Sequence, residues 1–280
     1  MMITANSRIH CLCSLLLFII HTQKTVVVDD TQLNVVVVGD IGLPERKSFI
    51  KTKVVRAICA QNEQVPFHLG INLGGNAYYN GLRKNEFAVL EWAISQSFPK
   101  AIFPFDFLTE LGKVDYDGDV DTELNYYVRY DNRFYLPNKN YFYDVTLSDG
   151  TSIRFICIDS TQLYETNPLE SDIRELQIQD TITLLDNSGF LTAIFNAYNH
   201  NMQWHSRWLI RPPVISVGNS ALNDPVTASR TPNSWCLSPT DGGYGQLSVT
   251  KQFAIFKFID SDGTILREEK IYPVDKSIFV

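Results

Sequence analysis

The sequence predicts a single α/β domain in which helices sandwich the β-sheets. Four consecutive valines at residues 35–38 indicate a short strand that is buried on both faces, as in parallel sheets. Strands alternate with helical segments early in the chain, and hairpin-linked strands follow near its end. The 280 residues are enough for one large domain or two small ones, and the order of the elements favours one.

The first strand ends at Gly39 and places Asp40 at its carboxyl end, while Gly42 lets the chain turn sharply. An acidic residue there faces the crevice in which open α/β sheets bind ligands. The remaining predicted elements are helices at 44–61, 84–96 and 172–185, strands at 67–73, 101–105, 191–195 and 213–217, a hairpin at 141–147 and 152–158, and a meander at 244–250, 252–259 and 265–271.

The composition favours a packed globular protein and disfavours nucleic acid as a partner. Apolar residues make up 45% of the chain and charged residues 20%, with a net charge of -7. The basic residues form no long run, so the electrostatic footprint of a nucleic-acid binder is missing.

The N-terminal segment at 1–23 is predicted to be a secretory signal peptide. Its apolar core at 11–20 is too short to span a bilayer comfortably, and an uncleaved anchor is the less favoured alternative. No second apolar run follows, so we expect no transmembrane anchor after cleavage and a lumenal or secreted protein. Cys59, Cys157 and Cys236 then remain, which allows at most one internal disulfide.

Four acidic residues alternate between positions 115 and 121, namely Asp115, Asp117, Asp119 and Asp121. With Gly118 they faintly resemble a calcium loop, but the closing glutamate is missing at the required spacing. The sequence therefore predicts an exposed acidic loop.

The motifs at the strand ends resemble those of the purple acid phosphatases, a group within the calcineurin-like metallophosphoesterases. The resemblance runs over residues 33–273 and implies a four-layer α/β/β/α sandwich with mixed sheets. In this family, five motifs (GDxG, GDxxY, GNH, VxxH and GHxH) hold two metal ions. The first motif is intact at 39–42, and the second is found at 74–78, where Gly75 replaces the bridging aspartate and Tyr78 is kept.

The other three motifs are degraded. The third is expected at 106–109, where Phe107 and Leu108 replace its Asn and His. The fourth is expected to be deleted between Asp159 and the strand at 191–195. The fifth lies at 197–200, where Tyr198 replaces the first His and His200 is the second.

The resemblance implies that Asp40, Tyr78 and His200 survive from the trivalent-iron site and that no ligand of the divalent site survives. The three residues are interpreted either as a mononuclear site for one iron ion or as a hydrogen-bonded group without metal. His68, His205 and Asp159 are better explained as surface or core polar residues.

Three functional hypotheses follow. The first is a catalytically degenerate phosphatase-like protein of the secretory pathway that acts as a scaffold or binding protein with a protein partner. The second is a residual acid phosphatase or other hydrolase with a mononuclear metal site. The third is a binding module whose emptied cleft is lined by Phe107, Leu108 and Tyr198.

The chain is also similar to the glideosome-associated phosphatase-like protein of apicomplexan parasites, another degenerate member of the family. The similarity involves Gly75-Asn76 and the region at 136–138. That relative has a membrane tail that we do not expect here, so the resemblance does not extend to an anchoring role.

Overall fold

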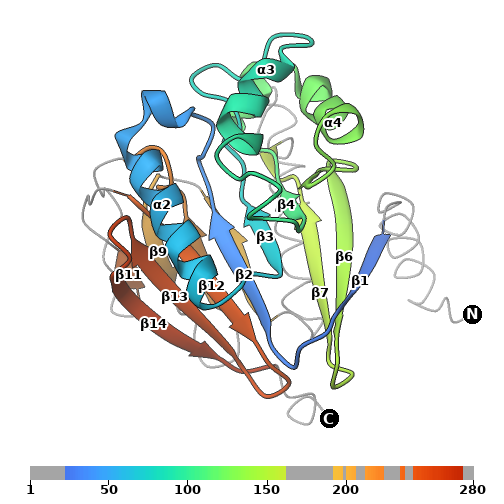
Figure 1. The fold of residues 1–280 in the computed structure, drawn as a ribbon, viewed down its shortest axis with the longest axis vertical. Coiled ribbons are helices and arrows are strands. Elements are labelled where there is room, and N and C mark those ends of the chain that lie inside the picture. The colour runs from blue at the N-terminus through green and yellow to red at the C-terminus, as the bar shows by residue number, and fades with distance from the viewer. Residues whose placement is uncertain are drawn as a thin grey trace, which may run out of the picture.

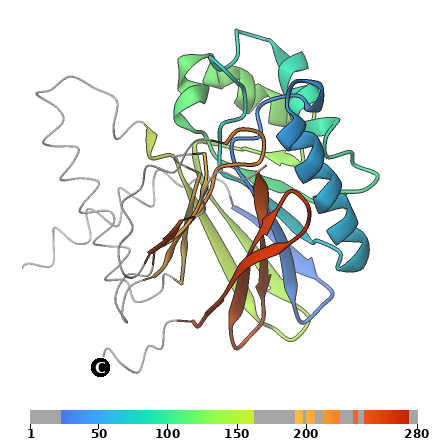
Figure 2. The same cartoon turned by 90° about the vertical axis from the view of Figure 1, so that its left-hand side faces the viewer.

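A computed structural model describes residues 23–161, 192–197, 200–205, 212–223, 234–236 and 242–273. Three mixed β-sheets and a small set of helices make up this part of the chain (Figure 1). Helix α2 covers one face of the largest sheet, and the two smaller sheets lie on the opposite side (Figure 2). The mixed α/β architecture confirms the predicted fold class.

The largest sheet has seven strands in the order β14-β13-β12-β2-β3-β4-β5. Its strands are β2 (Leu33–Val38), β3 (Leu69–Asn72), β4 (Phe107–Thr109), β5 (Phe134–Tyr135), β12 (Gly243–Val249), β13 (Ala254–Asp260) and β14 (Ile265–Ile271). Strands β2 to β5 pair in parallel, whereas β12 pairs antiparallel with β2 and continues into the predicted meander. Every residue of β2 is buried, as a strand covered on both faces requires.

The two smaller sheets are also mixed. One has the order β1-β6-β7 and consists of β1 (Gln23–Val28), β6 (Asn140–Leu147) and β7 (Ser152–Ile158). The other has the order β11-β9-β10-β8 and consists of β8 (Ile194–Asn196), β9 (Met202–His205), β10 (Val214–Val217) and β11 (Ser234–Cys236). Strand β1 was not predicted, and it pairs in parallel with β6.

The longest described helix is α2 (Phe49–Gln64), which follows the short 3-10 turn η1 (Glu45–Lys47). Ser48 caps α2, because its side-chain oxygen accepts the backbone N–H of Lys51 at 3.0 Å. The predicted apolar residues Val54, Val55 and Ile58 are buried against the sheet. The remaining helical elements are α3 (Phe87–Leu90), the π-helix η2 (Glu91–Ser95), the 3-10 turn η3 (Lys113–Asp117) and α4 (Val120–Arg129).

One predicted strand is wrong. The segment at 101–105 is not a strand, and the strand lies at Phe107–Thr109 instead. Pro104 has no backbone N–H to give to a sheet, so the chain enters β4 only after it. Phe103 is buried and packs edge-on against Phe98, which explains its apolar character without a strand.

Several expectations fall on other parts of the chain. The signal segment at 1–22 and the helix predicted at 172–185 lie outside the described residues. Cys59, Cys157 and Cys236 form no disulfide with one another. Among the described residues, no helix has both the length and the apolar character needed to cross a membrane.

Candidate functional site

The first loop of the candidate site follows β2 and presents Asp40. The Asp40 backbone N–H donates to the Gly74 carbonyl at 2.9 Å, which ties this loop to the loop after β3. Asp40 is buried and has a φ of 54°, in the left-handed region that few residues other than glycine adopt. His200 is also left-handed, with a φ of 44°. Backbone strain of this kind concentrates at functional sites.

The second loop, at residues 74–78, packs directly on the first. The N–H of Gly42 donates to the Gly75 carbonyl at 2.8 Å, and the N–H of Tyr78 donates to the Gly42 carbonyl at 3.2 Å. A Cβ atom on Gly42 would lie 2.5 Å from backbone atoms of Asn76 and Ala77. Gly42 therefore permits a close approach of the two loops.

The structure brings together the three predicted residues Asp40, Tyr78 and His200. The Tyr78 hydroxyl donates to Oδ1 of Asp40, and its oxygen lies 2.9 Å from Nε2 of His200. Nε2 of His200 lies 3.6 Å from the same Asp40 oxygen. Because a phenol has one proton, donation to Asp40 leaves the Tyr78 oxygen to accept an Nε2–H of His200. The three side chains thus come from three separate loops and meet at one point.

Gly75 faces this cluster from the second loop. A Cβ atom at position 75 would lie 2.3 Å from Oδ1 of Asp40 and 2.9 Å from the Tyr78 hydroxyl oxygen. The space for a side chain at this position is therefore taken by Asp40 and Tyr78. A two-metal centre with a bridging carboxylate from position 75 does not fit these residues.

A single metal ion is a different case. Carboxylate, phenol and imidazole groups suit one hard trivalent ion, and Asp40, Tyr78 and His200 are the residues that would hold it. Such an ion would supply Lewis-acid chemistry. Among the described residues, no three His, Cys, Asp or Glu side chains are grouped so that they could bind a metal.

The expected positions of the third motif are wrong. Phe107 and Leu108 lie inside β4 and are buried, with Leu108 opposite Ile71 of β3. The parallel register places Thr109 opposite Asn72, so residues 110–112 are the ones that follow the strand beside Gly74. Phe107 and Leu108 therefore belong to the core and do not line a cleft. Tyr198 lies outside the described residues.

Asp115 binds the backbone of the second loop. Its side chain is completely buried, so the expectation that Asp115 is exposed is wrong. The side chain accepts four backbone N–H groups. The donors are Gly75 at 3.0 Å, Asn76 at 2.7 Å, Ala77 at 3.2 Å and Gly112 at 2.8 Å. Three successive N–H groups that converge on one anion form a backbone nest. The carboxylate of Asp115 thus fixes the loop that carries Gly75 and Tyr78.

A second layer of polar residues lies around Asp115. The side-chain amide of Asn76 donates to Oε2 of Glu123 and to the Glu110 carbonyl, both at 2.9 Å. Asn72 donates to the Asn76 side chain at 2.6 Å. Sequence analysis gave none of these side chains a role, because only the fold brings them together.

Burial dominates the titration of these carboxyl groups. It raises the pKa of Asp115 to about 6 despite the four N–H donors, and it raises the pKa of Glu110 to about 8. Burial, together with the neighbouring charge of Asp115, also raises the pKa of Glu123 well above its ordinary value. Burial thus disfavours a charge on Glu123, whereas the backbone N–H groups favour the charged form of Asp115.

Lys51 ties the first loop to the helices. It lies in α2, is almost completely buried, and donates from Nζ to the carbonyls of Ile41 and Ala93. Burial lowers its pKa to about 7. The lysine thereby connects α2, the loop after Asp40 and η2.

The three polar residues set aside in the sequence analysis have local partners. His68 accepts the backbone N–H of Asn34 at 3.2 Å, and Nε2 of His205 lies 2.8 Å from the Gln203 side-chain oxygen. Asp159 is buried and accepts the Tyr116 hydroxyl. These contacts agree with structural roles.

Two solved structures share the fold of this chain. One is GAP50, the anchor in the inner membrane complex of Plasmodium, with a TM-score of 0.69 and 16% identity over 88% of this chain and 90% of that chain. The other is the purple acid phosphatase PPD1 from yellow lupin (Lupinus luteus) seeds, with a TM-score of 0.56 and 13% identity over 90% of this chain and 56% of that chain. A scan against family models and a search of curated proteins found no match. The chain therefore has a purple acid phosphatase-like fold.

Proposed function

We propose that this chain is a non-enzymatic protein of the secretory pathway, built on a purple acid phosphatase-like fold, that acts as a scaffold or binding protein for another protein. The observation that carries the proposal is the position of Gly75. The site lacks the carboxylate that would bridge two metal ions, and Asp40 and Tyr78 take the space that its side chain would need. Activation of water by two metal ions needs that bridging ligand, so we do not propose such a mechanism for this site.

The hydrogen bonds of Tyr78 support the same proposal. The phenol links Asp40 and His200 directly, so the surviving residues form a hydrogen-bonded polar cluster. GAP50 supports it by analogy of fold, because it is the anchor in the inner membrane complex of Plasmodium. A role in holding a partner protein needs a stable fold and a surface but no catalytic centre.

The convergence of Asp40, Tyr78 and His200 favours one alternative, a mononuclear iron site with residual acid phosphatase activity. Their donor atoms meet at one point and are of the types that a trivalent ion prefers. The two proposals differ in metal content and in the chemistry of the purified protein.

Three measurements on the purified protein distinguish the scaffold proposal from the mononuclear iron site. They are elemental analysis, a visible spectrum and a phosphomonoesterase assay. The scaffold proposal predicts a colourless, folded protein without stoichiometric metal, whose hydrolysis rate equals that of Asp40→Ala. The alternative predicts one iron ion with a tyrosinate band that Tyr78→Phe removes. Tyr79→Phe is the matched control, because Tyr79 is 68% exposed beside the site. Iron together with Asp40-dependent hydrolysis would overturn the scaffold proposal.

A further inference from the structure

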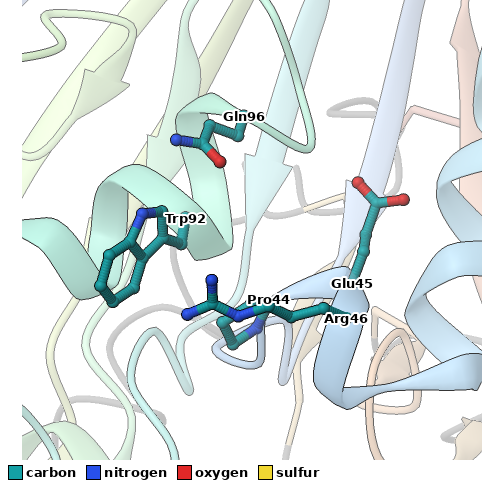
Figure 3. Close-up of a pocket in the computed structure, with 5 residues that line it drawn as sticks. All are labelled: Pro44, Glu45, Arg46, Trp92 and Gln96. Atoms are coloured by element: carbon teal, nitrogen blue, oxygen red, sulfur yellow. The ribbon is translucent and has the colours of Figure 1, made fainter.

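A hollow of about 120 Å³ opens on the surface just after the first loop. It is lined by Pro44, Glu45, Arg46, Trp92 and Gln96, and we call it the Trp92 hollow (Figure 3). Trp92 belongs to η2, whereas Glu45 and Arg46 belong to η1. The hollow thus lies between two helical turns, with the buried Pro44 between them.

Arg46 and Trp92 form the charged and aromatic wall of this hollow. The guanidinium carbon of Arg46 lies 4.5 Å from the centre of the indole ring, and Figure 3 shows the arginine extending toward the tryptophan. Trp92 remains 39% exposed. Within the described part of the chain, Arg46 forms no ion pair. Stacking holds the guanidinium in place while its N–H groups remain able to bind a carboxylate.

The segment that runs from Arg46 into α2 is rich in basic residues, although the chain as a whole has a net charge of -7. Residues 46–56 include five basic side chains and no acidic one, and four of the five are not buried. Phe49 adds a second exposed ring, which is 72% exposed at the start of α2. A partner that matches this charge would present acidic side chains.

We propose that the Trp92 hollow binds an acidic segment of a partner protein, with an apolar side chain seated against Trp92 and Pro44 and a neighbouring carboxylate paired with Arg46. The inference rests on the proposed scaffold function and names the surface that would carry it. Tryptophan and arginine are the residue types that most often dominate the binding energy of protein interfaces. The volume suits one inserted side chain, which a peptide can supply.

A displayed library of random peptides, selected on the full chain, tests the chemistry of the occupant. The expected peptides place Asp or Glu beside Leu or Phe. For a synthetic copy of an enriched peptide, Arg46→Gln and Trp92→Ala should each weaken binding about tenfold or more. Arg46→Lys should give a smaller loss, because lysine keeps the charge but loses the planar fork.

The matched controls are Lys270→Gln and Tyr272→Ala. Lys270 lies 5.2 Å from the ring centre of Tyr272, which is 64% exposed, so the two form a similar surface pair elsewhere. Both variants should keep binding within about twofold of the wild type. Selection of neutral or basic peptides, or binding that survives both Arg46→Gln and Trp92→Ala, would overturn the inference.

Vesicles of phosphatidylcholine with phosphatidylserine provide the competing probe. If the vesicles bind the wild-type chain but not the Arg46→Gln variant, the occupant is a membrane and the inference is wrong. The metal and hydrolysis measurements remain separate from this test. An inactive, metal-free chain that selects no peptide dependent on the hollow would overturn this inference alone, whereas iron-dependent hydrolysis would overturn the proposed function.

Discussion

The hydroxyl oxygen of Tyr78 lies 2.9 Å from Nε2 of His200 while its proton is donated to Asp40. One hydroxyl group therefore connects the loop after β2, the loop after β3 and the segment before β9. Polar atoms that could hold a metal ion thereby bind one another directly. The contribution of Tyr78 to stability is consequently measurable apart from any chemistry.

Replacement of Tyr78 by Phe should lower the free energy of unfolding by about 1–3 kcal/mol, because a buried carboxylate loses a hydrogen-bond donor. Urea denaturation measures the change. Tyr79→Phe is the control, and its exposed ring should give a change within about 0.5 kcal/mol. Equal effects of the two variants would mean that the cluster contributes nothing to stability.

Restoring the missing carboxylate with Gly75→Asp should destabilise the protein rather than create a metal centre. The new Cβ would overlap Oδ1 of Asp40, and φ at this position is 71°. Gly150→Asp is the control that separates the steric overlap from the cost of the left-handed backbone. Gly150 has a φ of 81°, but no heavy atom lies within 4 Å of the position that its Cβ would take. The control should lose about 1–2 kcal/mol and Gly75→Asp at least about 2 kcal/mol more. A stable Gly75→Asp variant that binds two metal ions would contradict this expectation.

Asp115→Asn should destabilise the protein by about 2–4 kcal/mol. The amide that replaces the carboxylate carries no charge, and its NH₂ group would face backbone N–H donors that need an acceptor. Asp117→Asn, two residues later on the exposed side of η3, should change stability by less than about 0.5 kcal/mol. Denaturant titrations of both variants provide the comparison, and equal values would show that the nest is unimportant.

The buried carboxyl groups predict that stability falls as the pH rises from about 5 to 8. The pKa of Glu110 is about 8 in the folded chain against an ordinary 4.5, and that of Asp115 is about 6 against 3.8. In this window the folded chain binds more protons than the unfolded chain, so raising the pH favours unfolding. Urea denaturation at both pH values measures the slope. Glu110→Gln should flatten it, whereas Glu268→Gln, at an exposed carboxylate, should leave it unchanged.

Because Lys51 is buried, we expect its contribution to the free energy of unfolding to increase with pH at higher pH. Its pKa is about 7 in the folded chain against an ordinary 10.5, so between these values the unfolded chain binds the extra proton. Stability should therefore rise with pH over this range as far as this group is concerned. Denaturation between about pH 8 and 9.5 measures the slope, and comparison with a variant that lacks the lysine isolates its contribution. Lys51→Met should abolish the rise, and Lys47→Met at an exposed position should retain it.

The sequence alone allowed prediction of the elements with strong periodicity and of the residues within an intact motif. The buried valines of β2, the apolar face of α2 and the C-terminal meander all occur where their patterns indicated. Asp40, Tyr78 and His200 were identified through the resemblance to the purple acid phosphatase motifs, which implies that they survive from one metal site. The contact between Asp40 and Tyr78 follows from the parallel arrangement of β2 and β3, whereas His200 comes from the segment before β9 in another sheet.

The residues that sequence reasoning misplaced depend on contacts distant in the chain. Asp115 looked like one member of an exposed acidic series, but its partners are N–H groups some 40 residues earlier. Phe107 and Leu108 were assigned to the site because no pattern marks where a three-residue strand begins. Strand β1 was missed since its partner, β6, lies more than 100 residues later. Local pattern carries no information about such pairings.

The position of β2 has a consequence for the order of events during synthesis. One neighbour, β3, emerges from the ribosome soon after β2, but the other, β12, is among the last parts of the chain to be made. The hydrogen bond from Ser248 to Asn34 closes a separation of 214 residues. Until that closure, the fully buried strand β2 has an unpaired edge, which is a hazard for aggregation. We therefore expect this topology to fold late and slowly and to benefit from chaperone protection until β12 has been made.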